Sequence, residues 1–136
     1  MFSAILGTLA VCAAAPTGPV DVFGALASAL AEHDAASFLR HFDPGMPELD
    51  RLAQNAAALA EQADVVSSID FLGRKDEGGE TVVQVDWAMT LQSRNGAAGG
   101  PTERRREILT ARLKHAGNAW RIASIEPLAF FDPPHF

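Results

Sequence analysis

The chain has 136 residues, a formal net charge of −6, 48% hydrophobic residues and 21% charged residues. These values are typical of one ordinary globular domain and exclude a disordered chain. An acidic protein repels polyanions at long range, so no nucleic-acid partner is expected.

The first stretch, MFSAILGTLAVCAAA, carries no charged side chain. A transmembrane helix needs about 20 apolar residues, and this stretch is shorter, so no membrane span is expected. Its length and its small residues at the end are typical of a secretory signal, although no Lys or Arg precedes the apolar run. We expect a leader over 1–18 and a single domain over 19–136. We expect a bacterial protein that is exported or periplasmic, and one that is cytoplasmic if the leader does not function.

The single cysteine, Cys12, lies in this leader and follows Val11. Valine is bulkier than the residue that a lipoprotein cleavage box takes before its cysteine, so lipid attachment is not expected. If the leader is removed, the mature domain contains no cysteine, which excludes disulfides and thiol catalysis from it.

Three helices are expected after the breaker cluster PTGP. A helix over 21–33, capped by Asp21, is indicated by apolar residues at positions i, i+3, i+4 and i+7: Phe23, Leu26, Ala27 and Leu30. A short helix follows, with Asp34 as its cap and with Phe38, Leu39 and Phe42 on its apolar side, and it ends at Asp43-Pro44-Gly45. A third helix begins near Pro47 and runs through alanines and leucines to Ala63.

The pattern then changes to period 2, which predicts strands over 65–74, 80–94, 103–115 and 119–127. They are joined by a glycine-rich turn at 76–79, a loop at 95–100 and a tight turn at 116–118. Three hairpin connections in a row predict an antiparallel sheet with the helices on one face, which is an α+β fold.

Two segments, FLRHFDP (38–44) and NAWRIASIEPL (118–128), together with the order of elements, resemble the nuclear transport factor 2-like superfamily. That superfamily includes ketosteroid isomerases, scytalone dehydratase and polyketide cyclases, and the resemblance covers roughly residues 20–131. It implies N-terminal helices packed on a strongly curved, cone-shaped, cystatin-like sheet that encloses a pocket. The superfamily holds enzymes, binding modules and assembly factors, so the fold leaves the function open.

The large apolar residues that should face the helices are the expected lining of such a pocket. They are Phe23, Phe38, Phe42, Phe71, Trp87, Met89 and Trp120. Residues of each of these types are more often plain core than ligand contacts. Phe130, Phe131 and Phe136 are expected to cover the pocket mouth or the sheet edge.

Asp86 alternates with Val85 and Trp87, so it should point away from the helices. There it would pair across strands with Arg112 or Lys114 rather than meet a substrate. By the same alternation, Asp70 should also point outward.

The isomerases and dehydratases of the superfamily use a carboxylate or histidine base with tyrosine or acid donors, and this chain has no tyrosine. His41 and Asp43 are the candidate acid–base pair. Alternatively, His41 interacts with a helix end and Asp43 starts a turn. The four histidines show no metal-ligand spacing, so neither a metal nor a cofactor is expected.

Three functions remain open. The first is an exported, noncatalytic domain that binds a small apolar ligand or forms a homodimer through its sheet. The second is a small lyase or isomerase of the polyketide cyclase type, acting through His41 and Asp43. The third is a protein-interaction module that uses the outer sheet face around Gln84, Asp86 and Arg112. The missing tyrosine and metal ligands weigh against the enzyme.

Overall fold

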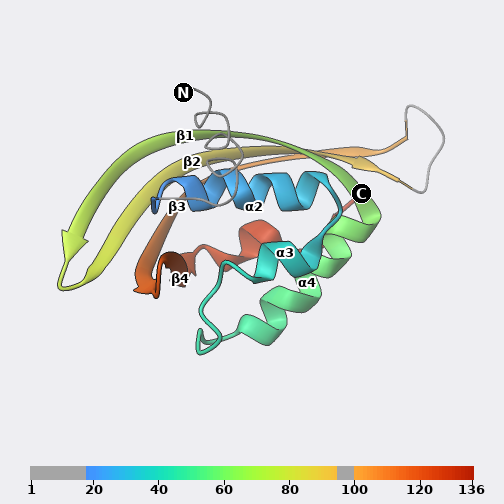
Figure 1. The fold of residues 1–136 in the computed structure, drawn as a ribbon. Coiled ribbons are helices and arrows are strands. Elements are labelled where there is room, and N and C mark those ends of the chain that lie inside the picture. The colour runs from blue at the N-terminus through green and yellow to red at the C-terminus, as the bar shows by residue number, and fades with distance from the viewer. Residues whose placement is uncertain (1–17, 95–99) are drawn as a thin grey trace, which may run out of the picture.

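The computed structural model describes residues 18–94 and 100–136. Three helices come first: α2 (Asp21–Ala31), α3 (Ala35–Leu39) and α4 (Leu49–Gln62). Four strands and a short 3-10 helix follow: β1 (Ala63–Glu77), β2 (Glu80–Ser93), β3 (Thr102–Ala116), β4 (Ala119–Glu126) and η1 (Leu128–Phe131). The strands form an antiparallel sheet in the order β1-β2-β3-β4. The sheet curls over the helices, which confirms the predicted α+β fold (Figure 1).

The helix α3 starts where the sequence predicts. The carboxylate of Asp34 accepts hydrogen bonds from the backbone N–H and the hydroxyl of Ser37, at 3.0 and 2.7 Å. The helix ends at Leu39, earlier than expected, because the chain then leaves it to pair with β4. Phe42 lies opposite Ile122 in a parallel bridge, so its predicted place on the helix is wrong.

At the hairpin between β1 and β2, β1 continues to Glu77 and is longer than predicted, whereas β2 begins at Glu80 as predicted. Gly78 and Gly79 have φ values of 54° and 89°, which a two-residue hairpin turn requires and which glycine adopts without strain. The strand pairing therefore continues to the turn and is interrupted only by a bulge between Phe71 and Gly73. This hairpin bends down past the end of α2 (Figure 1).

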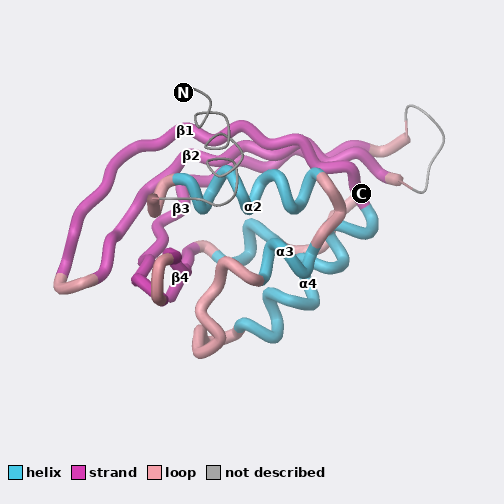
Figure 2. Tube along the Cα trace, viewed as in Figure 1, coloured by secondary structure: helices cyan, strands magenta, loops and turns pink. Residues whose placement is uncertain are grey.

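The core forms on the concave side of the sheet, where the helices gather (Figure 2). As the period-2 pattern predicts, one face of β2 and β3 is buried: Val83, Val85, Trp87, Met89, Leu91, Leu109, Ala111 and Leu113. Helical residues such as Phe23 and Leu52 pack against it. Burial of these side chains is the main favourable contribution to folding.

The C-terminal segment enters the same core. The rings of Phe130 and Phe131 lie 5.6 and 5.4 Å from the ring of Trp87, measured between centroids. Phe131 also contacts Phe38 edge-on at 5.4 Å. Of the three tail phenylalanines, only Phe136 is exposed, at 47%. Thus η1 closes the concave side of the sheet with two aromatic side chains.

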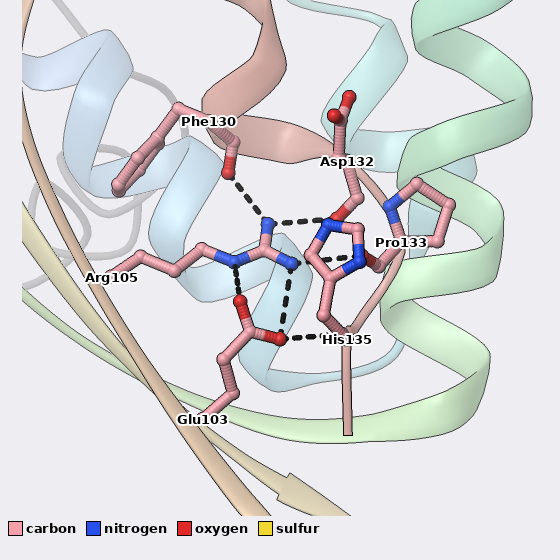
Figure 3. Close-up of polar contacts among 6 residues, drawn as sticks. All are labelled: Glu103, Arg105, Phe130, Asp132, Pro133 and His135. Atoms are coloured by element: carbon pink, nitrogen blue, oxygen red, sulfur yellow. Dashed lines mark hydrogen bonds and ion pairs between the residues drawn. The ribbon is translucent and has the colours of Figure 1, made fainter.

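Arg105 holds this segment in place (Figure 3). Its guanidinium donates to the backbone carbonyls of Phe130, Asp132 and Pro133 at 2.7, 2.7 and 2.9 Å. It also pairs with the carboxylate of Glu103 at 2.7 Å. Because the Arg105 side chain is only 9% exposed, it acts as a buried clamp rather than a solvated surface charge.

Candidate functional site

The residues predicted to line an interior pocket lie in different environments. Five of them are at most 1% exposed and belong to the core: Phe23, Phe38, Phe42, Trp87 and Met89. Their side chains and those of η1 occupy the space between helices and sheet, as the 5.2 Å contact between the Phe38 and Phe42 rings illustrates. The last two, Phe71 and Trp120, lie outside this cluster.

Phe71 does not line the interior. It is 49% exposed on β1, beside the bulge and next to Leu72, which is 50% exposed. The strand alternation placed it on the concave side, but β1 is an edge strand there and the described helices do not reach over it.

Trp120 lines a surface pocket of about 370 Å³ at the end of the sheet. The pocket forms where the chain leaving α3 pairs with β4, since Ile122 N–H donates to the carbonyl of His41 at 2.8 Å. The β3–β4 turn and the start of α2 complete it. Its lining includes Val22, Arg40, His41, Asn118, Trp120 and Arg121.

Positive charge dominates this pocket. Partial burial, with the nearby guanidinium groups of Arg121 and Arg40, lowers the pKa of His41 below its ordinary value. The imidazole is therefore neutral at pH 7. Arg121 donates to the backbone carbonyl of Arg40, which ties β4 to the end of α3. No acidic side chain lines the pocket among the described residues.

An aromatic surface lies beside these charges. Trp120 is paired with His115 across the β3–β4 hairpin, and their rings lie 3.8 Å apart between centroids with an interplanar angle of 35°. This contact supports the indole from outside the pocket. An aromatic face beside guanidinium groups can stack on a flat ligand while the arginines bind an acidic group.

The predicted acid–base pair is not assembled in the structure. Asp43 forms an ion pair with Lys114, with 3.2 Å between Oδ2 and Nζ. His41 instead shares the pocket with Arg40 and Arg121. Asp43, the other member of the predicted pair, does not line it. Arg40 and Arg121 were not among the predicted site residues, although they lie in the two segments, 38–44 and 118–128, that carry the family resemblance.

Asp86 points outward as predicted, but its partner is Arg106 and not Arg112 or Lys114. The guanidinium of Arg106 contacts both carboxylate oxygens, at 3.0 and 2.7 Å. Hydrogen bonding to Arg106 lowers the pKa of Asp86. Arg112 is engaged elsewhere, with Glu77 and Glu80. Register explains the difference, because Arg106 lies opposite Ala88, next to Asp86 on the same face.

The described residues contain no group of three or more His, Cys, Asp or Glu side chains arranged to hold a metal ion. None of their helices is long and apolar enough to cross a membrane.

No family model matches the chain, and no curated protein matches it. Solved structures do match it. A nuclear transport factor 2-like superfamily protein from Salmonella enterica superimposes with a TM-score of 0.59 at 13% identity, covering 77% of this chain and 83% of that one. A candidate dehydratase of the same family from Streptomyces avermitilis gives 0.64 at 11% identity, covering 78% and 90%. A candidate aromatic ring hydroxylase from Novosphingobium aromaticivorans gives 0.64 at 11% identity, covering 78% and 82%. At these identities the likeness establishes the fold alone, so the expected nuclear transport factor 2-like fold is confirmed.

Proposed function

We propose that this nuclear transport factor 2-like domain is a noncatalytic binding protein for a small organic acid with an apolar ring. One observation carries the proposal: Arg40 and Arg121 meet beside Trp120 in a pocket without lining acids, in a chain of net charge −6. A local excess of positive charge on an acidic protein favours an anionic ligand at that place.

The chemistry of the lining defines the ligand class. A guanidinium pairs with a carboxylate through two parallel N–H groups, which gives both strength and orientation. The indole of Trp120 offers a flat apolar surface for a ring. The volume of about 370 Å³ lies within the range typical of small-molecule sites. The sequence predicted an apolar ligand. The two arginines indicate that this ligand also carries an acidic group.

The absence of an assembled acid–base pair supports binding rather than catalysis. His41 has two cationic neighbours instead of a carboxylate that would raise its basicity. Asp43 is engaged with Lys114. A neutral His41 can still donate one hydrogen bond to a bound carboxylate.

The test uses 2-naphthoate and its neutral analogue 2-naphthol, titrated into the full chain by isothermal calorimetry. We expect saturable binding of the acid and about tenfold weaker binding of the neutral analogue. Arg40→Gln should weaken naphthoate binding by a similar factor, and so should Trp120→Leu. Arg51→Gln, which removes an arginine on α4 that pairs with Glu48, is the matched control and should have no effect. Equal binding of acid and neutral analogue would refute the proposed ligand class.

Catalysis is the second candidate, because a neutral His41 in the pocket has a free nitrogen lone pair that can accept a proton. A neutral imidazole beside two guanidinium groups can accept a proton from a carbon acid while the arginines bind the resulting anion. The candidate dehydratase from Streptomyces avermitilis has the same fold. Turnover of a bound acid that His41→Asn abolishes would establish catalysis, whereas a ligand recovered unchanged would favour binding.

Export is a separate proposal that rests on the apolar stretch before Pro16 and lies outside the described residues. Expression with an epitope at the C-terminus, followed by fractionation and intact mass measurement, tests it. A periplasmic protein that has lost its first residues is expected, and a full-length cytoplasmic protein would contradict export.

A further inference from the structure

The strand β3 has two neighbours along only part of its length. β4 pairs with it from Ala116 back to Thr110 and then ends at Glu126. Between Thr102 and Leu109, β3 pairs with β2 alone. Within the described part of the chain, this stretch is an open edge of the sheet, which we name the β3 edge.

The hairpin turn between β3 and β4 fixes which residues have backbone groups that face the β3 edge. Ala116 and Ala119 flank this two-residue turn, so they exchange backbone hydrogen bonds and Ala116 faces β4. Every second residue of a strand turns its N–H and C=O to the same side. The register with β2 runs without a shift, so the same count reaches Arg104, Arg106 and Ile108 at the β3 edge.

A contact of β4 gives the same assignment. Ile122 bonds on its far side, where its N–H donates to the carbonyl of His41 and its carbonyl accepts from the N–H of Asp43, each at 2.8 Å. Leu113, opposite Ile122, therefore turns its backbone groups to β2, as do the other odd-numbered residues of β3. Among the described residues, no backbone group bonds at the β3 edge to the even-numbered residues between 104 and 108. Unpaired N–H and C=O groups of this kind are a template for a further strand.

A groove of about 380 Å³ lies beside the β3 edge. Its lining is residues 103–107 of β3 together with Pro127, Ala129, Phe130 and His135. Arg105 ties the two walls together, since its guanidinium donates to the carbonyl of Phe130 at 2.7 Å (Figure 3). The groove is therefore preformed, and it can take side chains of a strand that is added to the edge.

The side chains along the β3 edge define the sequence that an added strand should have. Within the described residues, the exposed side chains of Arg104 and Glu107 form neither an ion pair nor a hydrogen bond. Arg106 is already bound to Asp86, at 3.0 and 2.7 Å. Ile108 is 55% exposed. By alternation Arg104 and Ile108 lie on the outer face of the sheet, and Glu107 lies on the groove side.

We propose that the β3 edge binds an extended peptide segment of a partner protein, which adds to the sheet as a further strand. The segment carries an apolar residue opposite Ile108, a basic residue opposite Glu107 and an acidic residue opposite Arg104. It runs antiparallel to β3, as β2 and β4 do, because antiparallel pairing is the more stable per residue. From its N-terminal end the segment therefore reads apolar, basic, two spacer residues, acidic.

Backbone and side chains contribute differently to this binding. The added strand exchanges two hydrogen bonds with each of Arg104, Arg106 and Ile108, and these bonds supply affinity for any extended chain. Residues directly opposite each other on one face have Cβ atoms about 5 Å apart, so both charge pairs form without bending the strand. The apolar stem of the basic residue lies over Pro127 and Phe130 in the groove. The charges and Ile108 supply the specificity.

An NMR titration of the isotope-labelled full chain with the peptide acetyl-Thr-Val-Lys-Thr-Thr-Glu-Thr-amide tests the proposal. We expect saturable shifts that are half-complete below about 1 mM peptide and largest at the amides of Arg104, Arg106 and Ile108. Shifts that do not saturate up to about 3 mM peptide overturn the proposal, and so do saturable shifts confined to other strands or to the helices.

Two methylated peptides separate strand addition from simple charge attraction. N-methylation of the valine and the glutamate removes N–H groups that would bond to β3, so binding should weaken at least about tenfold. N-methylation of the lysine and of the threonine before the glutamate removes N–H groups that face solvent, so binding should stay within about threefold of the original. Equal affinity of the two methylated peptides overturns the proposal.

Arg104→Glu should weaken binding of the original peptide about fivefold, because it replaces an attraction by a repulsion. A peptide with lysine in place of the glutamate should bind this variant to within about twofold of the original affinity. Arg51→Glu makes the same change of charge at an exposed site on α4 and should leave binding unchanged. If the lysine peptide binds Arg104→Glu no better than the original peptide does, the assigned register is wrong. The pocket at Trp120 is not part of the β3 edge, so the ligand proposal stands or fails separately.

Discussion

Replacement of Arg105 by methionine should destabilise the domain far more than loss of an ordinary surface arginine. The substitution keeps an apolar stem but removes four close hydrogen bonds, three of them to backbone carbonyls of the C-terminal segment (Figure 3). It also leaves Glu103, whose side chain is 17% exposed, without its cationic partner. The substitution therefore weakens the contacts that hold the C-terminal segment over the core.

The magnitude follows from burial. Removal of one member of a buried ion pair costs about 3–5 kcal/mol, because the remaining charge is left unpaired. The tail can retreat and let water reach its carbonyls, which limits the loss to the lower end of that range. We expect a decrease of about 3 kcal/mol in the free energy of unfolding, which a domain of ordinary stability survives. Arg105→Lys keeps the charge but loses the planar fork, so it should lose about half as much.

Urea unfolding followed by tryptophan fluorescence measures these values, since the indole of Trp87 packs on Phe130 and Phe131. A double-mutant cycle with Glu103→Gln isolates the ion pair and should give a coupling energy of about 1 kcal/mol or more. If Arg105→Met changes the free energy of unfolding by less than about 0.5 kcal/mol, the clamp does not hold the segment and the reasoning fails.

Three further outcomes are expected. Burial opposes ionisation of Glu103, but hydrogen bonds from Arg105 and from the backbone N–H of His135 outweigh it and lower the pKa of Glu103. The ionised Glu103 therefore contributes its whole stabilisation above the ordinary glutamate pKa, and this contribution is lost as the pH falls through the lowered pKa of the folded protein. We expect Glu103→Gln to make the free energy of unfolding depend less on pH in the acid range. The His41 ring should titrate below its ordinary pKa in an NMR titration, and Arg40→Gln should raise that pKa; an unchanged value would contradict the electrostatics. Phe131→Ala, at a site of 0% exposure, should cost about 3–5 kcal/mol in urea unfolding. Phe71→Ala, at 49% exposure, should cost less than about 1 kcal/mol, and equal losses would contradict the assignment of the core.

The fold was predictable because its signals are periodic. The alternation in β2 places Val85 and Trp87 inward, and burial follows it residue by residue. Asp34 was predictable as a helix cap because its side chain bonds to the backbone N–H of Ser37, only three residues later in the chain. The end of α3 was not, because a long-range bridge to β4 draws Phe42 out of the helix.

Arg105 shows a signal that was present and not used. Leu109, Ala111 and Leu113 face inward, so the same period places Arg105 and Glu103 inward as well. By composition alone, the run of three arginines at 104–106 is typical of a solvated strand end, and only the alternation separates Arg105 from its two neighbours. Only the hydrogen-bond partners of Arg105 could not be predicted, because they are backbone carbonyls about 25 residues away in the chain.

The pocket at Trp120 was beyond prediction for a related reason. Arg40 and Arg121 are far apart in sequence, and they meet only because the chain after α3 pairs with β4. Local pattern assigns each of them to an exposed position. The two arginines come together only through the tertiary fold, which the local sequence pattern does not reveal.

The long strand β1 has one hydrogen-bonded neighbour in the described structure, so its other edge is open along 15 residues. Such an edge can template the addition of strands from other molecules, which leads to aggregation. The bulge near Leu72 interrupts the ladder, and charged residues such as Lys75 and Asp76 follow it. An incoming strand would lose register at the bulge and then face these charges. The bulge beside Phe71 therefore works against the addition of further strands at this edge, which is the step that leads to fibrils.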